Sequence, residues 1–465
     1  MSDTTKLLKV DSPFDGEIVA EVALSGPDAI ANIVAQAQEA QRANAALTLD
    51  QRIALCERWC VAFEARADAV ARDISRMMGK PLGQARGEIT GTLERARTMM
   101  ALAPEALADD VLPEKAGFIR KIAKEPIGVT VIVAAWNYPL LIAVNGVIPS
   151  VLAGNSVILK HSGRTPLCGE HFAACFVEAG APQNLVQAIH CSHAVTAELV
   201  KHSGVDYVAF TGSVGGGQAV HGAAGGSLIN VTTELGGKDP AWVRADADLA
   251  FTIPNLVDGA MYNAGQSCCG IERVYVHDSI YEQVVQGIVE ETRKLTLGDP
   301  MVDGTGMGPL AQPGAADFLA AQVDDARSKG ARILLGGSKT QIDGKGRFFE
   351  PTVIADATHD MDVMMEESFG PIIAIARASD DEEALRLMND SPYGLTASIW
   401  TRDTDAAMAL APRIETGTVF MNRCDCLDPM LAWTGVKQTG RGVSLSRHGF
   451  GPLIRLKSYH LRLRD

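Results

Sequence analysis

Two adjacent cysteines, Cys268 and Cys269, lie in the stretch MYNAGQSCCG at residues 261–270. A thiolate is a strong nucleophile, but with an ordinary pKa of about 8.5 only a few per cent of a thiol is ionised at neutral pH. A catalytic cysteine therefore needs a partly exposed site that lowers its pKa. Burial of both thiols as small hydrophobic groups is the commoner fate of free cysteine. If the stretch is irregular or strand-like, neighbouring side chains point apart, and we expect at most one thiol to face a site.

A carboxylate, Glu234, ends an apolar run and precedes two glycines in NVTTELGGKDP. It follows Gly212 by 22 residues, so it has the spacing of a group that binds a ribose hydroxyl in a dinucleotide-binding unit. It also has the position of a general base at a strand end, where clefts form. Most glutamates at strand ends are solvated or paired, and spacing alone does not choose between these roles.

A glycine-rich turn occurs in VDYVAFTGSVGGGQAVHGAAGG, residues 205–226. The pattern predicts a strand, a turn and a helix whose amino terminus could bind a phosphate through free N–H groups. The glycines do not follow G-x-G-x-x-G, so the stretch is a weak dinucleotide signal. A turn that only packs a helix on a sheet explains it equally well.

Alternating strands and helices must position these groups. The first hundred residues have long helical patterns, with apolar residues three and four apart. After Val129, short β-branched runs alternate with helical stretches, which is typical of parallel βαβ units. A second series of such units follows, so we expect two α/β halves that meet near residue 236. The uncharged stretch 126–155 is broken by prolines and asparagines, which favours buried core over a membrane span.

Composition excludes several classes of function. The 465 residues include 42 basic and 56 acidic side chains, and the formal charge of −14 disfavours binding to nucleic acid or to an anionic membrane. Nine cysteines without regular spacing predict free thiols and no metal site. The first residues have no apolar signal segment, so we expect a cytoplasmic protein.

Several motifs in a fixed order resemble those of the NAD(P)-dependent aldehyde dehydrogenase superfamily. They are WNYPLL, VLAGNSVILKHSGRTPL, FTGSVGGG, ELGGKDP, NAGQSC, EESFGP and GVKQTGRG, and they cover nearly the whole chain. The resemblance implies an α/β fold with a Rossmann-type cofactor domain at residues 1–108 and 127–236 and a catalytic domain at 237–451. It also implies a small β oligomerisation segment at 109–126 and 452–465, and hence a homodimer or homotetramer.

The resemblance also assigns roles to individual residues. Cys268 falls on the nucleophile of the G-Q-x-C pattern, Glu234 on the general base, and Asn137 on the amide that stabilises the oxyanion. Cys269 is then a neighbour that points away. NAD or NADP is the implied cofactor, and the residues that line it are Lys160, Gly163, Gly212, Ser213, Glu367 and Phe369.

Three departures from the family pattern bear on specificity. Many relatives have a glutamate for the ribose diol where this chain has Gly163, so both NAD and NADP are expected, with Lys160 and Arg164 available to a 2′-phosphate. Gly146 occupies a position where many relatives have a lysine. If that lysine relays protons, another group must do so in this chain. The common P-F-G-G is replaced by AWTG, so the substrate class cannot be transferred.

The resemblance implies a tunnel for a small-molecule aldehyde. Its wall is expected to include Tyr138, Leu141, Asn145, Tyr262, Asp425 and Trp433. No arginine aligns with this wall, which disfavours a short carboxylated semialdehyde and favours an aromatic or medium-length aldehyde.

Two other functions compete with oxidation of an aldehyde to a free acid. A CoA-acylating relative would transfer the thioester to CoA, but the retained base Glu234 favours water as the acceptor. A catalytically silent binding or structural relative is the other alternative, and retention of Cys268, Glu234 and Asn137 together argues against it.

Overall fold

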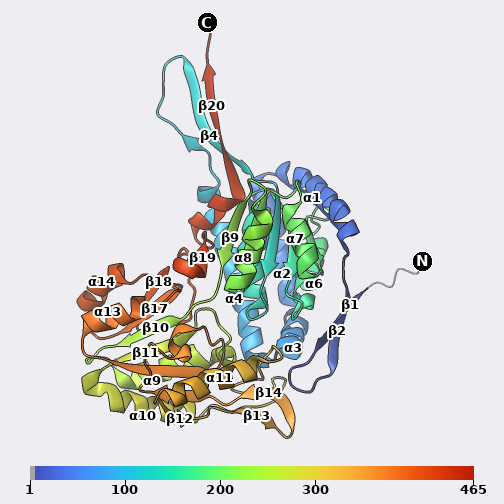
Figure 1. Cartoon of the computed structure of the whole chain (residues 1–465). Coiled ribbons are helices and arrows are strands. Elements are labelled where there is room, and N and C mark those ends of the chain that lie inside the picture. Colours follow the sequence, from blue (N-terminus) through green and yellow to red (C-terminus); the bar gives the residue numbers. More distant parts are fainter. Residues whose placement is uncertain (1–5, 465) are drawn as a thin grey trace.

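The computed structural model describes residues 6–464 and contains two α/β units and a projecting β-sheet (Figure 1). The first unit is built on a six-stranded sheet in the order β19-β9-β8-β5-β6-β7. All neighbouring strands in it are parallel except β19 and β9. The strands are β5 (Val129–Ala134), β6 (Ser156–His161), β7 (Val186–Ile189), β8 (Tyr207–Thr211), β9 (Asn230–Glu234) and β19 (Gly440–Arg441).

Helices cover this sheet because each parallel strand pair needs a crossover connection. The crossover helices are α5 (Pro139–Leu152), α6 (Pro166–Glu178), α7 (His193–Lys201) and α8 (Val214–Ala224). Four helices from the start of the chain pack around them: α1 (Ile30–Ala45), α2 (Leu49–Ala65), α3 (Ala67–Met78) and α4 (Leu82–Ala106). Thr48 and Gln51 form a capping box that starts α2, and Gly79, in a left-handed conformation, ends α3. A hairpin of β1 (Leu7–Asp11) and β2 (Ile18–Ala23) precedes them.

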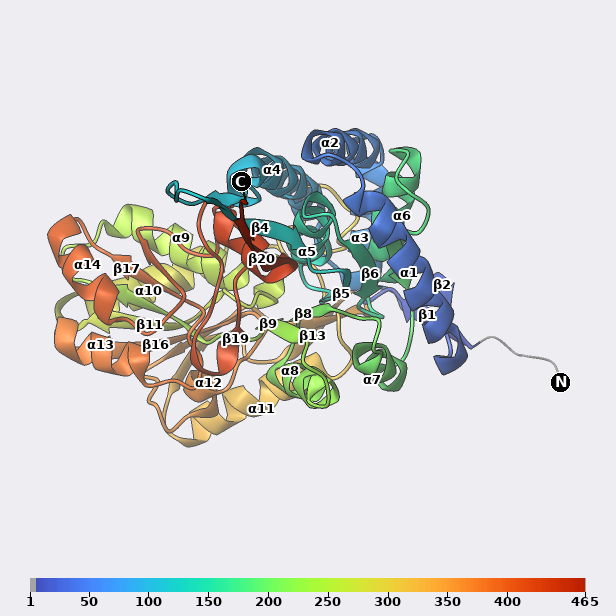
Figure 2. The same ribbon diagram turned by 90° about the horizontal axis from the view of Figure 1, so that it is seen from above.

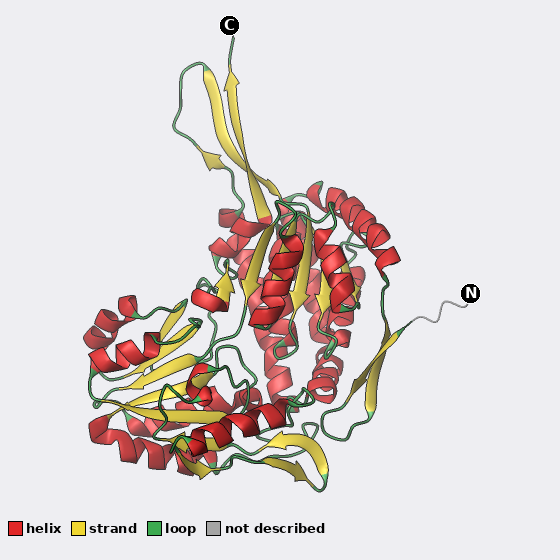
Figure 3. Cartoon of the chain, in the orientation of Figure 1, coloured by secondary structure: helices red, strands yellow, loops and turns green. Residues whose placement is uncertain are grey.

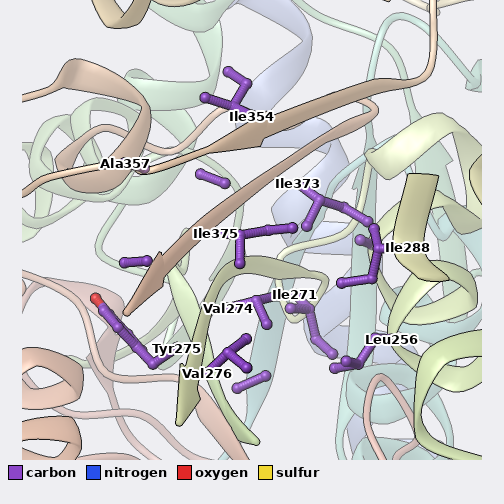
Figure 4. Close-up of a cluster of buried hydrophobic side chains, with 14 of the residues drawn as sticks. Leu256, Ile271, Val274, Tyr275, Val276, Ile288, Ile354, Ala357, Ile373 and Ile375 are labelled. Carbon is purple, nitrogen blue, oxygen red and sulfur yellow. The ribbon is translucent and has the colours of Figure 1, made fainter. Parts of the chain in front are cut away.

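The second unit is built on a seven-stranded sheet in the order β12-β15-β16-β11-β10-β17-β18, parallel except for β12. Its strands are β10 (Asp239–Val243), β11 (Ile271–His277), β12 (Arg332–Leu335), β15 (Thr352–Ala355), β16 (Ile372–Ala378), β17 (Thr396–Trp400) and β18 (Thr418–Met421). Its helices are α9 (Leu249–Met261), α10 (Tyr281–Thr292), α11 (Ala315–Ser328), α12 (Asp362–Met365), α13 (Asp381–Asn389) and α14 (Thr404–Leu410). Apolar side chains of β11, β15 and β16 pack with those of α9 and α10 into one core (Figure 4). A hairpin of β13 (Lys339–Ile342) and β14 (Lys345–Phe349) flanks this unit.

A three-stranded antiparallel sheet projects from the first unit (Figures 1 and 3). It contains β3 (Asp110–Val111), β4 (Phe118–Pro126) and β20 (Ile454–Arg462), in the order β20-β4-β3. β20 pairs with β4 along its whole length, so one edge of β20 has no partner strand within residues 6–464.

The predicted α/β fold class is confirmed, and strands alternate with helices after Val129 as predicted. The stretch 126–155 forms β5 and the buried helix α5, as predicted for core. No helix between residues 6 and 464 is long and apolar enough to span a membrane. The sequence analysis missed β10 and β15, whose short runs DPAWV and TVIA have no alternating pattern because both faces are covered. It also missed the return of residues 440–441 to the first sheet, beside β9 (Figure 2).

Candidate active site

The carboxyl ends of the parallel strands of the first sheet face the second unit, which is where α/β sheets bind ligands. A cavity of about 320 Å³ opens beside them. Its wall is formed by the end of β9, the turn that contains Cys268 and Cys269 (the cysteine turn), one face each of α4 and α5, and the segment 424–433. Cys268, Glu234, Tyr138, Leu141, Asn145, Tyr262, Asp425 and Trp433 all line it. Eight residues proposed from the sequence are thus brought together from distant segments.

A strained turn carries the cysteines. Asn263, Ala264 and Gly265 follow α9 with positive φ angles of 54°, 57° and 69°. A side chain at Gly265 would collide with the carbonyl of Gly370, so only glycine fits there. The Asn263 amide holds the turn by donating to the carbonyls of Asn137 and Gln266, at 3.1 Å each. This strain is maintained by buried hydrogen bonds, as at many functional sites.

Both cysteines line the cavity, so the expectation that Cys269 points away from the site is wrong. The reason is that residues 267–270 form a turn, in which successive side chains do not alternate as they do in a strand. Cys268 is partly exposed, whereas Cys269 is buried and donates its thiol hydrogen to Asp425 Oδ1 at 2.9 Å. The contact with Cys268, burial and the Asp425 carboxylate raise the pKa of Cys269 well above its usual value. Cys269 therefore stays a thiol.

Asp425 bridges the cysteine turn to the segment 424–433. Its Oδ1 accepts hydrogen bonds from Ser267 Oγ and from Cys269 Sγ, both at 2.9 Å. Burial raises the pKa of Asp425 to about 6, against the lowering effect of these two donors. The carboxylate fixes the residues on both sides of Cys268.

Glu234 is the last residue of β9, and its carboxylate accepts two hydrogen bonds. Ser444 Oγ donates to Oε1 at 2.5 Å, and Thr211 Oγ1 donates to Oε2 at 3.4 Å. Burial raises the pKa of Glu234, and both donors together with the nearby Arg95 oppose that rise. A carboxylate that is buried but held by hydrogen bonds suits a base that works near neutral pH. Ser444 belongs to the segment that the sequence analysis did not place beside this sheet.

Asn137 lies in the loop between β5 and α5, with its side chain buried. Its amide Nδ2 donates to the carbonyl of Gln266 at 3.3 Å, two residues before Cys268. This contact brings an amide donor to the cysteine turn, where an oxyanion formed at Cys268 would need one.

The cofactor-side residues lie at the ends of β6 and β8. Lys160, at the end of β6, is buried, and burial lowers its pKa. It forms no ion pair with any other residue in the range 6–464, so an anionic or hydroxyl-bearing ligand would supply its missing partner. Gly212 and Ser213 join β8 to α8, and Ser213 Oγ caps the helix by accepting from Gly216 N at 3.2 Å.

Glu367 and Phe369 lie in a loop that a buried ion pair anchors. Lys238 and Glu272 form this pair, and Glu272 also accepts hydrogen bonds from the backbone N–H groups of Ser368 and Phe369, at 2.7 and 2.9 Å. Glu367 accepts from Gly237 N at 2.9 Å, and burial raises its pKa to about 8. The sequence analysis did not single out Lys238 or Glu272 as supports of this loop.

The structure bears on two of the departures. Arg164 pairs with Asp11 of β1, Nη1 to Oδ1 at 2.5 Å, and Asp11 also pairs with Arg347, so Arg164 would have to share or leave this carboxylate to bind a 2′-phosphate. At Gly146, a Cβ would lie 2.8 Å from Ile132 Cδ1, so Ile132 fills the space where a lysine stem would begin.

The sequence analysis missed four charged residues of the cavity wall, Glu88, Glu94, Asp258 and Arg95. Arg95, on α4, lines the cavity with Cys268 and Glu234, so the expectation of a wall without arginine is wrong. The sequence does contain a pattern that places Arg95 on a helix face with other residues of the wall. Gln84, Gly87, Glu88, Gly91, Glu94 and Arg95 recur at three- and four-residue spacing and share the face of α4 toward the cavity. That spacing predicts that these residues share one face of a helix, but no sequence motif predicts that this face lines the cavity.

A partly exposed thiol and a buried carboxylate share a cavity at the carboxyl ends of a parallel sheet, which is the arrangement of an α/β enzyme with a cysteine nucleophile. Residues 1–459 match the aldehyde dehydrogenase family. The chain belongs to that family.

Individual relatives agree with this assignment. The chain is 35% identical over 439 residues to the succinate semialdehyde dehydrogenase [NAD(P)+] Sad of Escherichia coli, covering 94% of each protein. It is 32% identical over 451 residues to betaine aldehyde dehydrogenase 1 of Rhizobium meliloti, covering 97% of this chain and 92% of the relative. A solved betaine aldehyde dehydrogenase of Staphylococcus aureus in complex with NAD+ superposes with a TM-score of 0.95 at 27% identity, covering 99% and 93%.

The comparisons confirm the predicted family, the predicted class of enzyme and the predicted use of NAD or NADP. The chain is an NAD(P)-dependent aldehyde dehydrogenase. The roles of its individual residues and its domain boundaries stay predictions.

Proposed function

We propose that the chain oxidises an aldehyde to a carboxylic acid with Cys268 as the nucleophile and Glu234 as the general base. The observation that carries this proposal is that both side chains line one cavity, with Cys268 partly exposed and Glu234 buried at the end of β9. Cys269 is the less suitable thiol because its pKa is raised and its hydrogen is already donated to Asp425.

In the first half of the reaction, Cys268 Sγ attacks the aldehyde carbon and the carbonyl oxygen becomes an oxyanion. The Asn137 amide and the Cys268 backbone N–H stabilise this charge, which develops only after attack. A hydride then leaves the same carbon and a thioester to Cys268 remains. In the second half, Glu234 takes a proton from water, the hydroxide attacks the thioester, and the acid leaves with regeneration of the Cys268 thiolate.

The hydride acceptor is NAD(P)+, which supplies that chemistry when bound. Lys160, Gly163, Gly212, Ser213, Glu367 and Phe369 would hold it. The unpaired Lys160 and the capped amino terminus of α8 fit a ligand with phosphate and ribose groups. Gly163 has no side chain to repel a 2′-phosphate, so both NAD and NADP are expected to work.

The test is reduction of the cofactor at 340 nm with a panel of aldehydes, with and without CoA. Formation of the free acid without CoA is expected. Absolute dependence on CoA would favour the acylating alternative, and no reduction with any aldehyde would favour a silent relative. The relatives named above act on succinate semialdehyde and betaine aldehyde, one anionic and one cationic, so kinship alone leaves the substrate open.

The projecting sheet supports a homodimer or homotetramer. The free edge of β20 offers backbone hydrogen-bonding groups over Ile454–Arg462. Exposed apolar side chains follow the sheet at Val111, Ile119, Leu456, Leu461 and Leu463. A second copy of the chain would cover both, and sedimentation of a monomer at micromolar concentration would contradict this. All nine cysteines are free thiols, which supports action in the reducing cytoplasm.

A further inference from the structure

The cavity contains a buried cation without a counter-ion. The Arg95 residue is only 8% exposed, and burial lowers the pKa of its guanidinium. Arg95 forms no ion pair with any residue in the range 6–464. Among other buried cations, Lys80 and Lys238 are each paired with a glutamate and Arg273 donates to backbone carbonyls, whereas Lys160 at the cofactor side also has no ion pair. A buried charge without a partner is strongly destabilising, so an unpaired guanidinium in a ligand cavity indicates that a ligand supplies the partner.

One half of the guanidinium is fixed by α5. Arg95 Nη1 donates to the carbonyl of Leu141 at 3.1 Å and to Asn145 Oδ1 at 3.2 Å. The Nε and Nη2 groups have no acceptor among the described residues, and neither is sealed off from the cavity. These two groups form one edge of the planar guanidinium. That edge matches the two oxygens of a carboxylate, which it can bind through two parallel hydrogen bonds.

The carboxylates in the wall have donors other than Arg95, although the charge of Arg95 lies near enough to Glu234 to oppose the rise in its pKa. Glu88 pairs with Lys80 and accepts from the backbone N–H of Leu140 at 2.8 Å. Asp425 has the Ser267 and Cys269 donors, and Glu234 has the Ser444 and Thr211 donors, as described above. Asp258, whose pKa is raised by burial, and the exposed Glu94 form no ion pair with Arg95. Arg95 is therefore the cationic group of this wall that has free donors.

Two glycines make room beside Arg95. Gly91 and Gly87 lie about one and two turns before it, respectively, on the same face of α4. A Cβ at Gly91 would lie 3.2 Å from Leu141 Cδ2, so a larger residue there would press on the cavity wall. With a volume of about 320 Å³, the cavity suits a short substrate that contacts both Cys268 and Arg95, which share its wall.

We propose that Arg95 binds the distal carboxylate of the substrate, and that the enzyme therefore prefers short aldehydes with a carboxylate at the far end. The inference rests on the proposed function, in which the aldehyde end reacts at Cys268. It replaces the aromatic or medium-length aldehyde expected from a wall without arginine.

The test compares two substrates that differ in one charge. Succinate semialdehyde has the carboxylate, and its methyl ester has the same chain without the charge. The wild type is expected to show a kcat/KM about 100-fold higher for the acid. Arg95→Met is expected to bring the ratio of kcat/KM for the acid to kcat/KM for the ester down to about one. The ratio is the readout because Arg95 also opposes the rise in the pKa of Glu234, which affects both substrates alike. Arg95→Lys keeps the charge without the planar edge and is expected to recover only part of the preference.

The matched control is Arg97→Met, which removes an exposed arginine of the same helix that pairs with Glu57. It is expected to leave both substrates unaffected. Equal kcat/KM for the acid and the ester in the wild type would overturn the inference, as would an Arg95→Met variant that keeps the preference.

A binding titration separates failure of this inference from failure of the proposed function. Succinate, which cannot be oxidised here, is titrated calorimetrically into the wild type, Arg95→Lys and Arg95→Met. Binding that weakens about 100-fold in Arg95→Met supports the carboxylate site even if no aldehyde is oxidised. No binding of succinate to the wild type, or equal binding to all three folded proteins, would overturn it. If Arg95→Met does not fold, Arg95→Lys and the wild-type substrate pair still decide.

Discussion

The two ends of the cavity differ in how the chain builds them. At the reacting end, Cys268 and Glu234 lie on a strained turn and on a strand end, and hydrogen bonds made by Asn263 and Ser444 support them. At the distal end, Arg95 lies in the middle of the long helix α4, which contributes one face of side chains from a segment far away in the sequence. Backbone geometry positions the functional groups of the reacting end, whereas the chemistry of the distal end depends on which residue lies on one face of α4. Specificity can therefore change without touching the catalytic groups.

The largest expected effect separates the two neighbouring thiols of the reacting end. Cys268→Ala should lower kcat at least about 10⁴-fold, because it removes the proposed nucleophile and the neighbouring Cys269 stays a thiol. Cys269→Ala should retain activity within about fivefold, because Asp425 keeps its hydrogen bond from Ser267. Steady-state rates of both variants at saturating aldehyde test this. Similar losses would mean that the pair acts as a unit.

The next effect concerns the base. Glu234→Gln should lower the steady-state rate about 10²- to 10⁴-fold, because hydrolysis of the thioester loses its base. In this variant the steady-state rate should be limited by hydrolysis of the thioester. Cofactor reduction should therefore show a fast first turnover followed by a slow steady-state phase. Stopped-flow absorbance at 340 nm measures both phases. A variant whose first turnover is as slow as the later ones would show that Glu234 also activates the thiol.

A smaller effect should come from the hydrogen bond to Glu234. Ser444 lowers the pKa of Glu234 by donating to its carboxylate, so Ser444→Ala should raise that pKa further. The base works only when ionised, so the acidic limb of the pH profile of kcat should move to higher pH. We expect a loss of about tenfold at pH 6 and less than about twofold at pH 9. Thr434→Ala, on an exposed hydroxyl of the same segment, is the control. A uniform loss at all pH values would contradict this.

The smallest effect should occur at the cofactor end, away from both ends of the substrate cavity. Gly163→Glu adds a carboxylate that repels a 2′-phosphate, so kcat/KM for NADP should fall about tenfold while that for NAD changes less than about threefold. A Cβ at this position lies 3.3 Å from Leu8 Cδ2, so Leu8 must shift by a few tenths of an ångström. Equal losses for NAD and NADP would indicate a packing defect instead of charge repulsion.

The fold and the reacting end could be predicted from the sequence because both depend on local patterns. Alternating β-branched runs and helices predict a parallel sheet, and the motifs around Glu234 and Cys268 lie at its strand ends. The orientation of Cys269 was not predictable, because a turn with three left-handed residues breaks the alternation of side chains. Ser444 and Arg95 could not be placed either, because each reaches the cavity through long-range packing that no local pattern encodes.

The central claim is that Cys268 carries the acyl group and Glu234 releases it. The most direct measurement is mass spectrometry of peptides from Glu234→Gln quenched after mixing with succinate semialdehyde and NAD(P)+. The account predicts one acyl group per chain, attached to Cys268 and formed with one equivalent of reduced cofactor. An acyl group on Cys269, or reduced cofactor without any acyl-enzyme, would contradict it.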